Sequence, residues 1–319
     1  MLEESNFVQE LDSLALRRWE RSAVELAARQ RVPDSILGAH RTIALADINR
    51  QWALWFIESF GDPGRYIAAA SGYEEVFKEV LSGVERRFPT WQSVARKELA
   101  RTVARAIYSS VRRAREQGRR RSIEFEDRRL LLDLSGSPPR CWICGGAFDE
   151  ASIERFLGGS DAPIETRPFV DALRPRGMRE RDMRIEVDHL EPYSEGGEED
   201  ENLALACGFC NRHKGAYTSV YDVKGKPLSG AIDVGGLCSL PQPFWTVRVL
   251  GLVGRCEHPD GCESTTKNAE LTVCPVSDTG AMNPTNLRVT CYEHDPLWRS
   301  RFIARSICET MWQKVRDGL

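Results

Sequence analysis

The sequence predicts an α+β protein made of three parts, and three observations support that fold class. Apolar residues recur at helical spacing through the first 130 residues. Stretches that alternate between apolar and polar residues, as half-buried strands do, begin only after this region. Closely spaced cysteine pairs bracket the middle of the chain, and further cysteines follow. We therefore expect a helical domain at residues 1–130, a small mixed module at 131–230, and a second small module with a terminal helix at 231–319.

Composition limits the class of protein. The 319 residues carry a net charge of −3, so positive charge for a polyanionic partner must be concentrated locally. No apolar run approaches the length of a membrane span, and the acidic start at Glu3 and Glu4 is unlike a secretory signal. The ten cysteines include two Cys-x-x-Cys pairs, which favour metal sites over disulfides. We expect a cytoplasmic protein that does not bind membranes.

The first 130 residues are expected to form a domain for partner binding, sensing or nucleic-acid binding, and to offer a surface for a homo-oligomer or a protein partner. The aromatic residues Trp52, Trp55 and Phe56 follow helical spacing, so core packing is favoured over stacking on bases.

An arginine-rich helix is expected from about residue 91 to 117, with Arg101, Arg105 and Arg112 opposite its apolar stripe. Between positions 101 and 129 the chain has ten arginines and four acidic residues. This surface is either a track for a DNA or RNA backbone or a solvated face paired with acidic segments of the same chain, and the sequence leaves both open.

Four cysteines are spaced for a structural metal site. Cys141 and Cys144 form one Cys-x-x-Cys pair, Cys207 and Cys210 form another, and 62 residues separate the pairs. Each pair can supply two thiolates from one tight turn, and four thiolates bind Zn²⁺ tetrahedrally. One pair alone is equally typical of a redox dithiol. Two pairs flanking one segment favour zinc, which would have no open position for catalysis.

The segment 184–214 contains the candidate catalytic residues. It opens with a half-buried strand that ends in Asp188 and His189, and Gly196-Gly197 then marks a loop. Histidine can act as a neutral base near pH 7, since its reference pKa is about 6.5. Aspartate and asparagine oxygens suit Mg²⁺ or Mn²⁺. A base for water and a cation for the phosphate are what hydrolysis of a phosphodiester needs.

The order of these residues resembles the HNH endonucleases, also called ββα-metal or His-Me finger nucleases. The matching residues are Asp188-His189, Asn202 thirteen residues after the histidine, and Asn211 nine residues further on. With its two Cys-x-x-Cys pairs, the segment looks like the zinc-stapled form of that family. The resemblance covers about residues 139–216 and implies a ββα nuclease module.

The resemblance implies a role for each matching residue. Asp188 matches the first ligand of a catalytic Mg²⁺ or Mn²⁺, His189 matches the general base, and Asn202 matches the residue that orients the base. Asn211 matches the second metal ligand. His213 stays a further candidate for that ligand, although the spacing favours Asn211. The implied products have 5′-phosphate and 3′-hydroxyl ends.

Several basic residues are candidates for contact with nucleic-acid phosphates. In the nuclease-like module they are Arg184, Arg212 and Lys214, and in the helical region they are Arg105 and Arg112. The segment 145–181 is expected to be an irregular insertion whose arginines contact phosphates or stay solvated.

A second metal site is expected in the C-terminal module. Its candidate ligands are Cys256, Cys262, Cys291 and His294, with Cys274 and His258 in reserve, which would make a Zn(Cys)₃His site like that of a zinc ribbon. Buried free cysteines are the alternative, and we expect it for Cys238 and Cys308.

Three further elements are predicted in this module. The stretches 245–253 and 287–291 alternate like strands. The chain is expected to close with a helix whose apolar stripe is formed by Trp298, Phe302, Ile303, Ile307, Met311 and Val315.

These expectations combine into one function. The sequence predicts a metal-dependent endonuclease that cuts DNA, with a role in restriction or defence as a fold-level analogy. One alternative is a zinc-stabilised nucleic-acid-binding protein without catalysis, which predicts salt-sensitive binding and no cutting. Another is a ribonuclease effector whose helical region senses a signal or a partner.

Overall fold

The computed structural model describes residues 2–15, 17, 19–116, 123–159, 163–190, 202–229 and 234–317. The loop predicted at Gly196-Gly197 and the arginines at positions 119–121 lie outside the described residues. Buried apolar side chains form two separate clusters, one within residues 66–111 and the other within residues 132–312. Among the described residues, no helix combines the length and the apolar character needed to cross a membrane.

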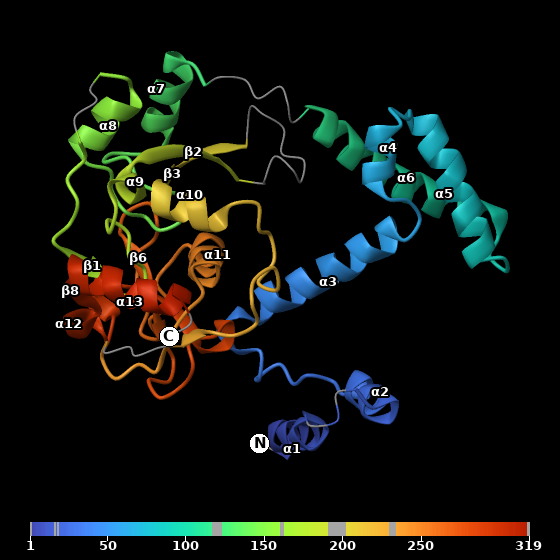
Figure 1. The fold of residues 1–319 in the computed structure, drawn as a ribbon, viewed down its shortest axis with the longest axis horizontal. Coiled ribbons are helices and arrows are strands. Elements are labelled where there is room, and N and C mark those ends of the chain that lie inside the picture. The colour runs from blue at the N-terminus through green and yellow to red at the C-terminus, as the bar shows by residue number, and fades with distance from the viewer. Residues whose placement is uncertain are drawn as a thin grey trace.

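The N-terminal part is entirely helical (Figure 1). Its helices are α1 (Leu2–Ala15), α2 (Arg21–Arg29), α3 (Arg41–Glu58), α4 (Pro63–Ala68), α5 (Tyr73–Arg87) and α6 (Ser93–Glu116). The helices α4, α5 and α6 pack around the first cluster, where Val76, Val80, Val103 and Ile107 are fully or almost fully buried. The predicted stripe of α6 is confirmed, and Arg101, Arg105 and Arg112 lie exposed on its other side.

The helix α3 connects the helical bundle to the rest of the molecule (Figure 1). Trp52 and Trp55 lie edge to edge, with ring centroids 5.5 Å apart, and are 63% and 54% exposed. The prediction that these rings pack in a core is therefore wrong. Only the last turns of α3, with Phe56 and Ile57, reach the bundle core. The helix α3 runs from one core to the other, so its middle turns are exposed to solvent even though their apolar residues have helical spacing.

The start of α3 is tied to the second unit by a buried ion pair. The Asp47 carboxylate is 1% exposed and accepts hydrogen bonds from Arg248 Nε and from the Val220 backbone N–H, both at 2.8 Å. Arg248 Nη2 also donates to the second carboxylate oxygen. Because one partner comes from residue 47 and the others from beyond residue 219, the contact fixes this end of the helix.

The second unit contains short helices and four two-stranded antiparallel sheets. Its elements are α7 (Phe125–Leu134), α8 (Glu150–Phe156), β1 (Phe169–Asp171), α9 (Glu180–Met183), β2 (Ile185–His189), β3 (Leu203–Cys207), α10 (Gly208–Lys214), β4 (Leu228–Ser229), β5 (Ser239–Leu240), α11 (Pro243–Val253), β6 (Leu271–Pro275), β7 (Leu287–Cys291), α12 (Trp298–Arg301), β8 (Phe302–Ala304) and α13 (Arg305–Asp317). Two-stranded sheets are marginal alone. Here the four sheets share one core, and this core joins the two modules that were expected on either side of residue 230. The domain boundaries themselves remain predictions.

Two element predictions are wrong in the C-terminal module, and the strand at 287–291 is confirmed as β7. The stretch 245–253 is the helix α11, not a strand. Pro243 opens α11 in its first turn, and Gly254 ends it with a left-handed φ of 62°. Trp245, Val247, Val249 and Leu250 are all buried, so the helix lacks a polar face and its pattern does not reveal its period.

The terminal helix is shorter than predicted. The residues Phe302–Ala304 form β8, which pairs with β1, and only α13 continues to the end of the described chain. Ile307 is 60% exposed, while Cys308, Met311 and Trp312 are buried. The pairing with β1 interrupts the helix, and the core-facing side of α13 combines the predicted Met311 and Val315 with Cys308 and Trp312.

The segment 145–181 is more ordered than predicted, since it contains α8, β1 and part of α9. Two of its arginines are buried instead of solvated. Arg174 and Arg176 are 1% and 2% exposed, and both contact the Glu270 carboxylate. Arg174 also donates to the Tyr292 hydroxyl at 3.0 Å.

A second buried charge network joins β1 to the C-terminal segment. Arg301 is fully buried, and its guanidinium donates to both oxygens of Asp171 at 2.9 Å and to Asp295 Oδ2 at 2.5 Å. Thr272 completes the network, since its hydroxyl donates to Asp171 and accepts from Arg301.

We expect the substitution Arg301→Met to destabilise the protein by about 3–5 kcal/mol, because it leaves two buried carboxylates without their cation. The free energy of unfolding from urea denaturation is the measurement. Arg21→Met is the control, since Arg21 forms only an exposed ion pair with Glu25 and should change stability by less than about 1 kcal/mol. Equal effects of the two substitutions would contradict this account of the network.

Candidate active site and metal centres

The strands β2 and β3 form a hairpin, and α10 begins directly after it. The register pairs Ile185 with Cys207 and His189 with Leu203. At Gly208 a Cβ atom would lie 2.0 Å from the Arg181 carbonyl oxygen, so only glycine allows the chain to turn from strand to helix at this point. The helix then packs against the hairpin, which gives the ββα arrangement that the resemblance implied.

Asp188 lies between the hairpin, the helix and the first cysteine turn. Its carboxylate is 5% exposed, with Oδ1 accepting from Lys214 Nζ at 2.9 Å and Oδ2 accepting from the Trp142 indole N–H at 3.0 Å. Burial raises the pKa of Asp188, and the charge of Lys214 opposes that rise. Lys214 Nζ also donates to the His189 carbonyl oxygen. Each carboxylate oxygen keeps a lone pair, so the group can still bind a hard cation.

Asn211, in α10, faces Glu186, which lies two positions before Asp188 on the same face of β2. Its Nδ2 donates to Glu186 Oε2 at 2.7 Å. A carboxylate only accepts hydrogen bonds, so the amide nitrogen must face Glu186 and the amide oxygen must point elsewhere. Arg181 Nε holds the other oxygen of Glu186 at 3.2 Å. The oxygen of Asn211 is therefore oriented by its neighbours and is suited to a hard cation.

His189 and Asn202 lie at the end of the hairpin where the connecting loop leaves and rejoins the two strands. The backbone N–H of Leu190 donates to the Asn202 carbonyl oxygen at 2.8 Å, which joins the residues that follow His189 and precede Leu203. Asn202 is 8% exposed and His189 is half-buried. Adjacent strand residues point to opposite faces, so His189 and Asp188 start from opposite sides of the hairpin.

His213 and Arg212 point away from Asp188, toward α9. The His213 ring packs on Phe209, with ring centroids 4.5 Å apart, and burial lowers its pKa to about 4. Arg212 forms an ion pair with buried Asp182, at 2.7 Å between Nη2 and Oδ1. The other arginine candidates lie apart from the hairpin end: Arg184 pairs with Glu180 at 2.8 Å, and Arg105 and Arg112 belong to the bundle.

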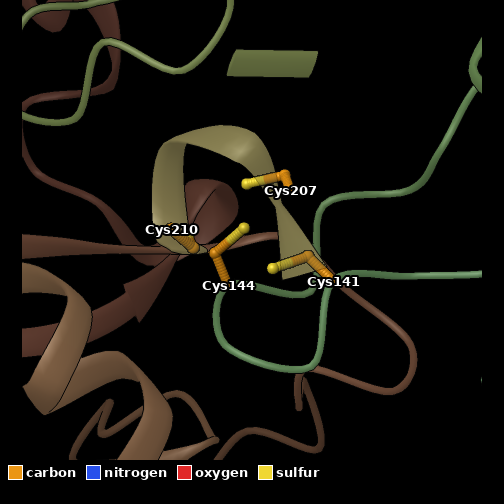
Figure 2. Close-up of side chains that lie close together, drawn as sticks. All are labelled: Cys141, Cys144, Cys207 and Cys210. Atoms are coloured by element: carbon orange, nitrogen blue, oxygen red, sulfur yellow. The ribbon is translucent and has the colours of Figure 1, made fainter. Parts of the chain in front are cut away.

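The four cysteines of the first predicted metal site come together. The sulfur atoms of Cys141, Cys144, Cys207 and Cys210 all lie within 4.8 Å of one another, and Figure 2 shows them converging from two turns. All four are buried, and none forms a disulfide. Their donor chemistry and spacing fit a tetrahedral zinc ion.

The second predicted site is also assembled. The ligand atoms of Cys256, Cys262, Cys291 and His294 lie within 4.8 Å of one another, with 3.3 Å between Cys291 Sγ and His294 Nδ1. These donors too can hold a zinc ion.

The remaining cysteines and the reserve ligands lie outside both groups. The His258 ring stacks on the His294 ring at 4.1 Å between centroids, and Cys274 is buried in β6. Cys308 is a buried free cysteine as predicted, but Cys238 is exposed, so the prediction for that residue is wrong.

The sequence reasoning missed two residues that hold the candidate site. Trp142 lies inside the first cysteine turn, where nothing in its spacing indicates contact with Asp188. Glu186 could have been found, because residues two positions apart in a strand share a face and Glu186 therefore faces the same way as Asp188.

We expect two zinc ions per chain by elemental analysis of the purified protein. Cys210→Ser and Cys291→Ser should each leave one, because each removes a ligand from a different group. Cys308→Ser is the control, since Cys308 is buried outside both groups and its loss should leave two. A wild-type protein without zinc, or zinc loss in the Cys308 variant, would refute the assignment.

The comparisons with known proteins match the hairpin and helix to one family. Residues 176–216 match the family model described as HNH endonuclease, a segment that includes β2, β3 and α10. Neither the curated proteins nor the solved structures give a match. The chain therefore contains an HNH endonuclease domain at residues 176–216.

Proposed function

We propose that this protein is a metal-dependent endonuclease that hydrolyses phosphodiester bonds in DNA. The observation that supports this most is a pair of side-chain contacts between β2 and α10 within the HNH domain. Asp188 contacts Lys214 at 2.9 Å and Glu186 contacts Asn211 at 2.7 Å, so both candidate cation ligands face one strand–helix interface. A role in restriction or defence belongs to the same proposal, as an analogy with other nucleases of this fold.

The proposed reaction assigns one task to each residue. His189 accepts the proton of the attacking water, which its neutral imidazole can do near pH 7. Asp188 and Asn211 would hold Mg²⁺ or Mn²⁺ through their oxygens, and Asn202 keeps the end of the hairpin closed beside the base. A divalent cation held there would neutralise charge on a phosphate oxygen and on the departing 3′ oxygen.

The contacts of Lys214 and His213 refine this proposal. Lys214 opposes the rise in the pKa of Asp188 that burial causes, and it fixes the strand end through the His189 carbonyl. The His213 ring packs on Phe209, while Asn211 lies beside Glu186, which shares a strand face with Asp188. We therefore favour Asn211 over His213 as the second ligand of the catalytic cation.

We expect His189→Ala to lower the rate of DNA cleavage by about 10²–10⁴-fold, the usual contribution of a general base. The measurement is nicking and linearisation of a supercoiled plasmid with Mg²⁺ or Mn²⁺. Zinc content and thermal unfolding should stay at wild-type values, because His189 belongs to neither cysteine group. Cleavage at the wild-type rate by this variant would show that the base is assigned wrongly.

The same assay, run with single-stranded RNA and without divalent metal, separates the alternatives. A non-catalytic nucleic-acid binder predicts salt-sensitive binding and no metal-dependent cutting of either substrate. A ribonuclease effector predicts cutting of RNA alone. Cutting of DNA that requires the divalent metal and His189 is the result that supports our proposal.

We expect Glu186→Ala to raise the Mg²⁺ concentration needed for half-maximal cleavage, by about tenfold, as is typical when a residue that orients a metal ligand is lost. Without Glu186 the Asn211 amide can rotate and offer its nitrogen in place of its oxygen. Glu186→Gln should recover most of the affinity, because its amide oxygen still accepts from Asn211 Nδ2. An unchanged Mg²⁺ requirement in the alanine variant would rule out this positioning role.

A further inference from the structure

A cavity of about 480 Å³ lies along β2, beside the candidate active site. In the part of the chain that the structure describes, the sheet has two strands, so one edge of β2 has no strand partner there, and α8 packs against β2. The cavity is lined by Ile123, Arg128, Ser152, Arg155, Phe156, Ile164, Arg184, Ile185, Glu186, Val187 and Asn211. Its volume falls within the range of about 300–1,000 Å³ that is usual for small-molecule sites.

One wall of this cavity carries an excess of positive charge. Arg155 and Arg184 both pair with the single carboxylate of Glu180, at 2.8 Å each. Arg128 donates to the Phe156 carbonyl oxygen at 3.0 Å and lies 5.8 Å from the centroid of its ring. Within the described residues no carboxylate pairs with Arg128. The wall thus carries three guanidinium groups, two of which share the Glu180 carboxylate. The carboxylate that lines the cavity, Glu186, is already held by Arg181 and Asn211, and this balance favours an anionic ligand.

The remaining walls of the cavity are mainly apolar. Phe156, Ile164, Ile185 and Val187 give the cavity an apolar surface next to the arginines. An inorganic anion would not need that surface, whereas the sugar and base of a nucleotide would cover it. Aromatic and aliphatic side chains next to arginines are the usual surroundings of a nucleotide that is not stacked in a duplex.

The cavity borders the candidate active site. Asn211 and Glu186 line it, and their hydrogen bond of 2.7 Å connects β2 with α10. A nucleotide bound there would contact Asn211, one of the two proposed cation ligands.

We propose that this pocket binds one unstacked nucleotide of the substrate next to the scissile bond, with its phosphate on the arginine wall and its base on the apolar wall. The proposal rests on the proposed nuclease function for the identity of its ligand. It assigns α7 and α8, which supply Arg128, Arg155 and Phe156, to substrate selection.

The test is isothermal titration of the full chain with thymidine 5′-monophosphate, thymidine and inorganic phosphate, without added divalent metal. We expect the monophosphate to bind more tightly than either fragment. Arg128→Met and Arg155→Met should each weaken its binding by about tenfold, the effect of losing one charge-assisted hydrogen bond. Arg65→Met is the matched control, since Arg65 also pairs with a glutamate and lies over an aromatic ring, but in the helical bundle.

Three results would overturn the proposal: no saturable binding of the monophosphate, phosphate binding as tight as that of the nucleotide, or wild-type affinity in both pocket variants. Thermal unfolding of each variant shows whether it is folded, and charge-retaining Arg128→Lys should restore part of the affinity. Because binding is measured without cleavage, this test is independent of the nuclease assay. A protein that binds the monophosphate but cuts no nucleic acid would support the pocket and refute the proposed function alone.

Discussion

The structure depends most on the closure of the four-cysteine group that joins residues 141–144 to residues 207–210. Trp142 lies between the two cysteines of the first turn, and it contacts both the hairpin and the candidate site. Its backbone N–H donates to the Leu205 carbonyl oxygen at 2.9 Å, and its indole donates to Asp188 at 3.0 Å. Any ion that holds the sulfurs together therefore also holds β3 and the buried carboxylate. A centre with four thiolate ligands has no open position for catalysis, but here it fixes the position of Asp188, a proposed ligand of the catalytic cation.

Burying four thiolates requires positive charge nearby, and the structure supplies it from an unexpected segment. A zinc ion with four thiolate ligands has a net negative charge, which is costly in a dry interior. Arg174 and Arg176 are almost fully buried close to this group, and the charge of Arg174 helps to lower the pKa of Cys144, after the hydrogen bonds of its neighbouring cysteines. Glu270 balances the two arginines in turn. Arg174 and Arg176 thus serve the stability of the metal centre, whereas Arg155 of the same insertion lies along the cavity and stays a candidate for substrate contact.

The sequence predicted the site better than the fold around it, for physical reasons. Metal ligands must obey spacing rules, so both cysteine groups were found from their positions alone, and the matching of residues 176–216 agrees with the resemblance. Helix α6 was found because one face packs on a core and the other meets water. By contrast, α11 is apolar on nearly every side, so the spacing of its apolar residues could not distinguish a helix from a strand. Trp52 and Trp55 followed helical spacing correctly, but spacing does not show whether a partner surface lies opposite. Buried ion pairs such as that of Asp47 and Arg248 join residues 201 positions apart, and no local pattern indicates them.

The distribution of charge matters for the proposed action on a polyanion, because the net charge of the protein is −3. Several arginines are paired with carboxylates, as Arg212 is with Asp182 and Arg301 is with Asp171. Among the described residues, arginines are exposed along one face of α6, and three others line the cavity beside β2. The helix α3 connects the units that carry these two surfaces, and its buried Asp47 fixes one end of that connection (Figure 1). A substrate long enough to reach both surfaces would gain affinity from α6 without any change at the active site, because a second tethered contact adds to the first. Under the proposed function, the helical region would add to substrate binding, and the residues next to β2 would decide where the nucleic acid is cut.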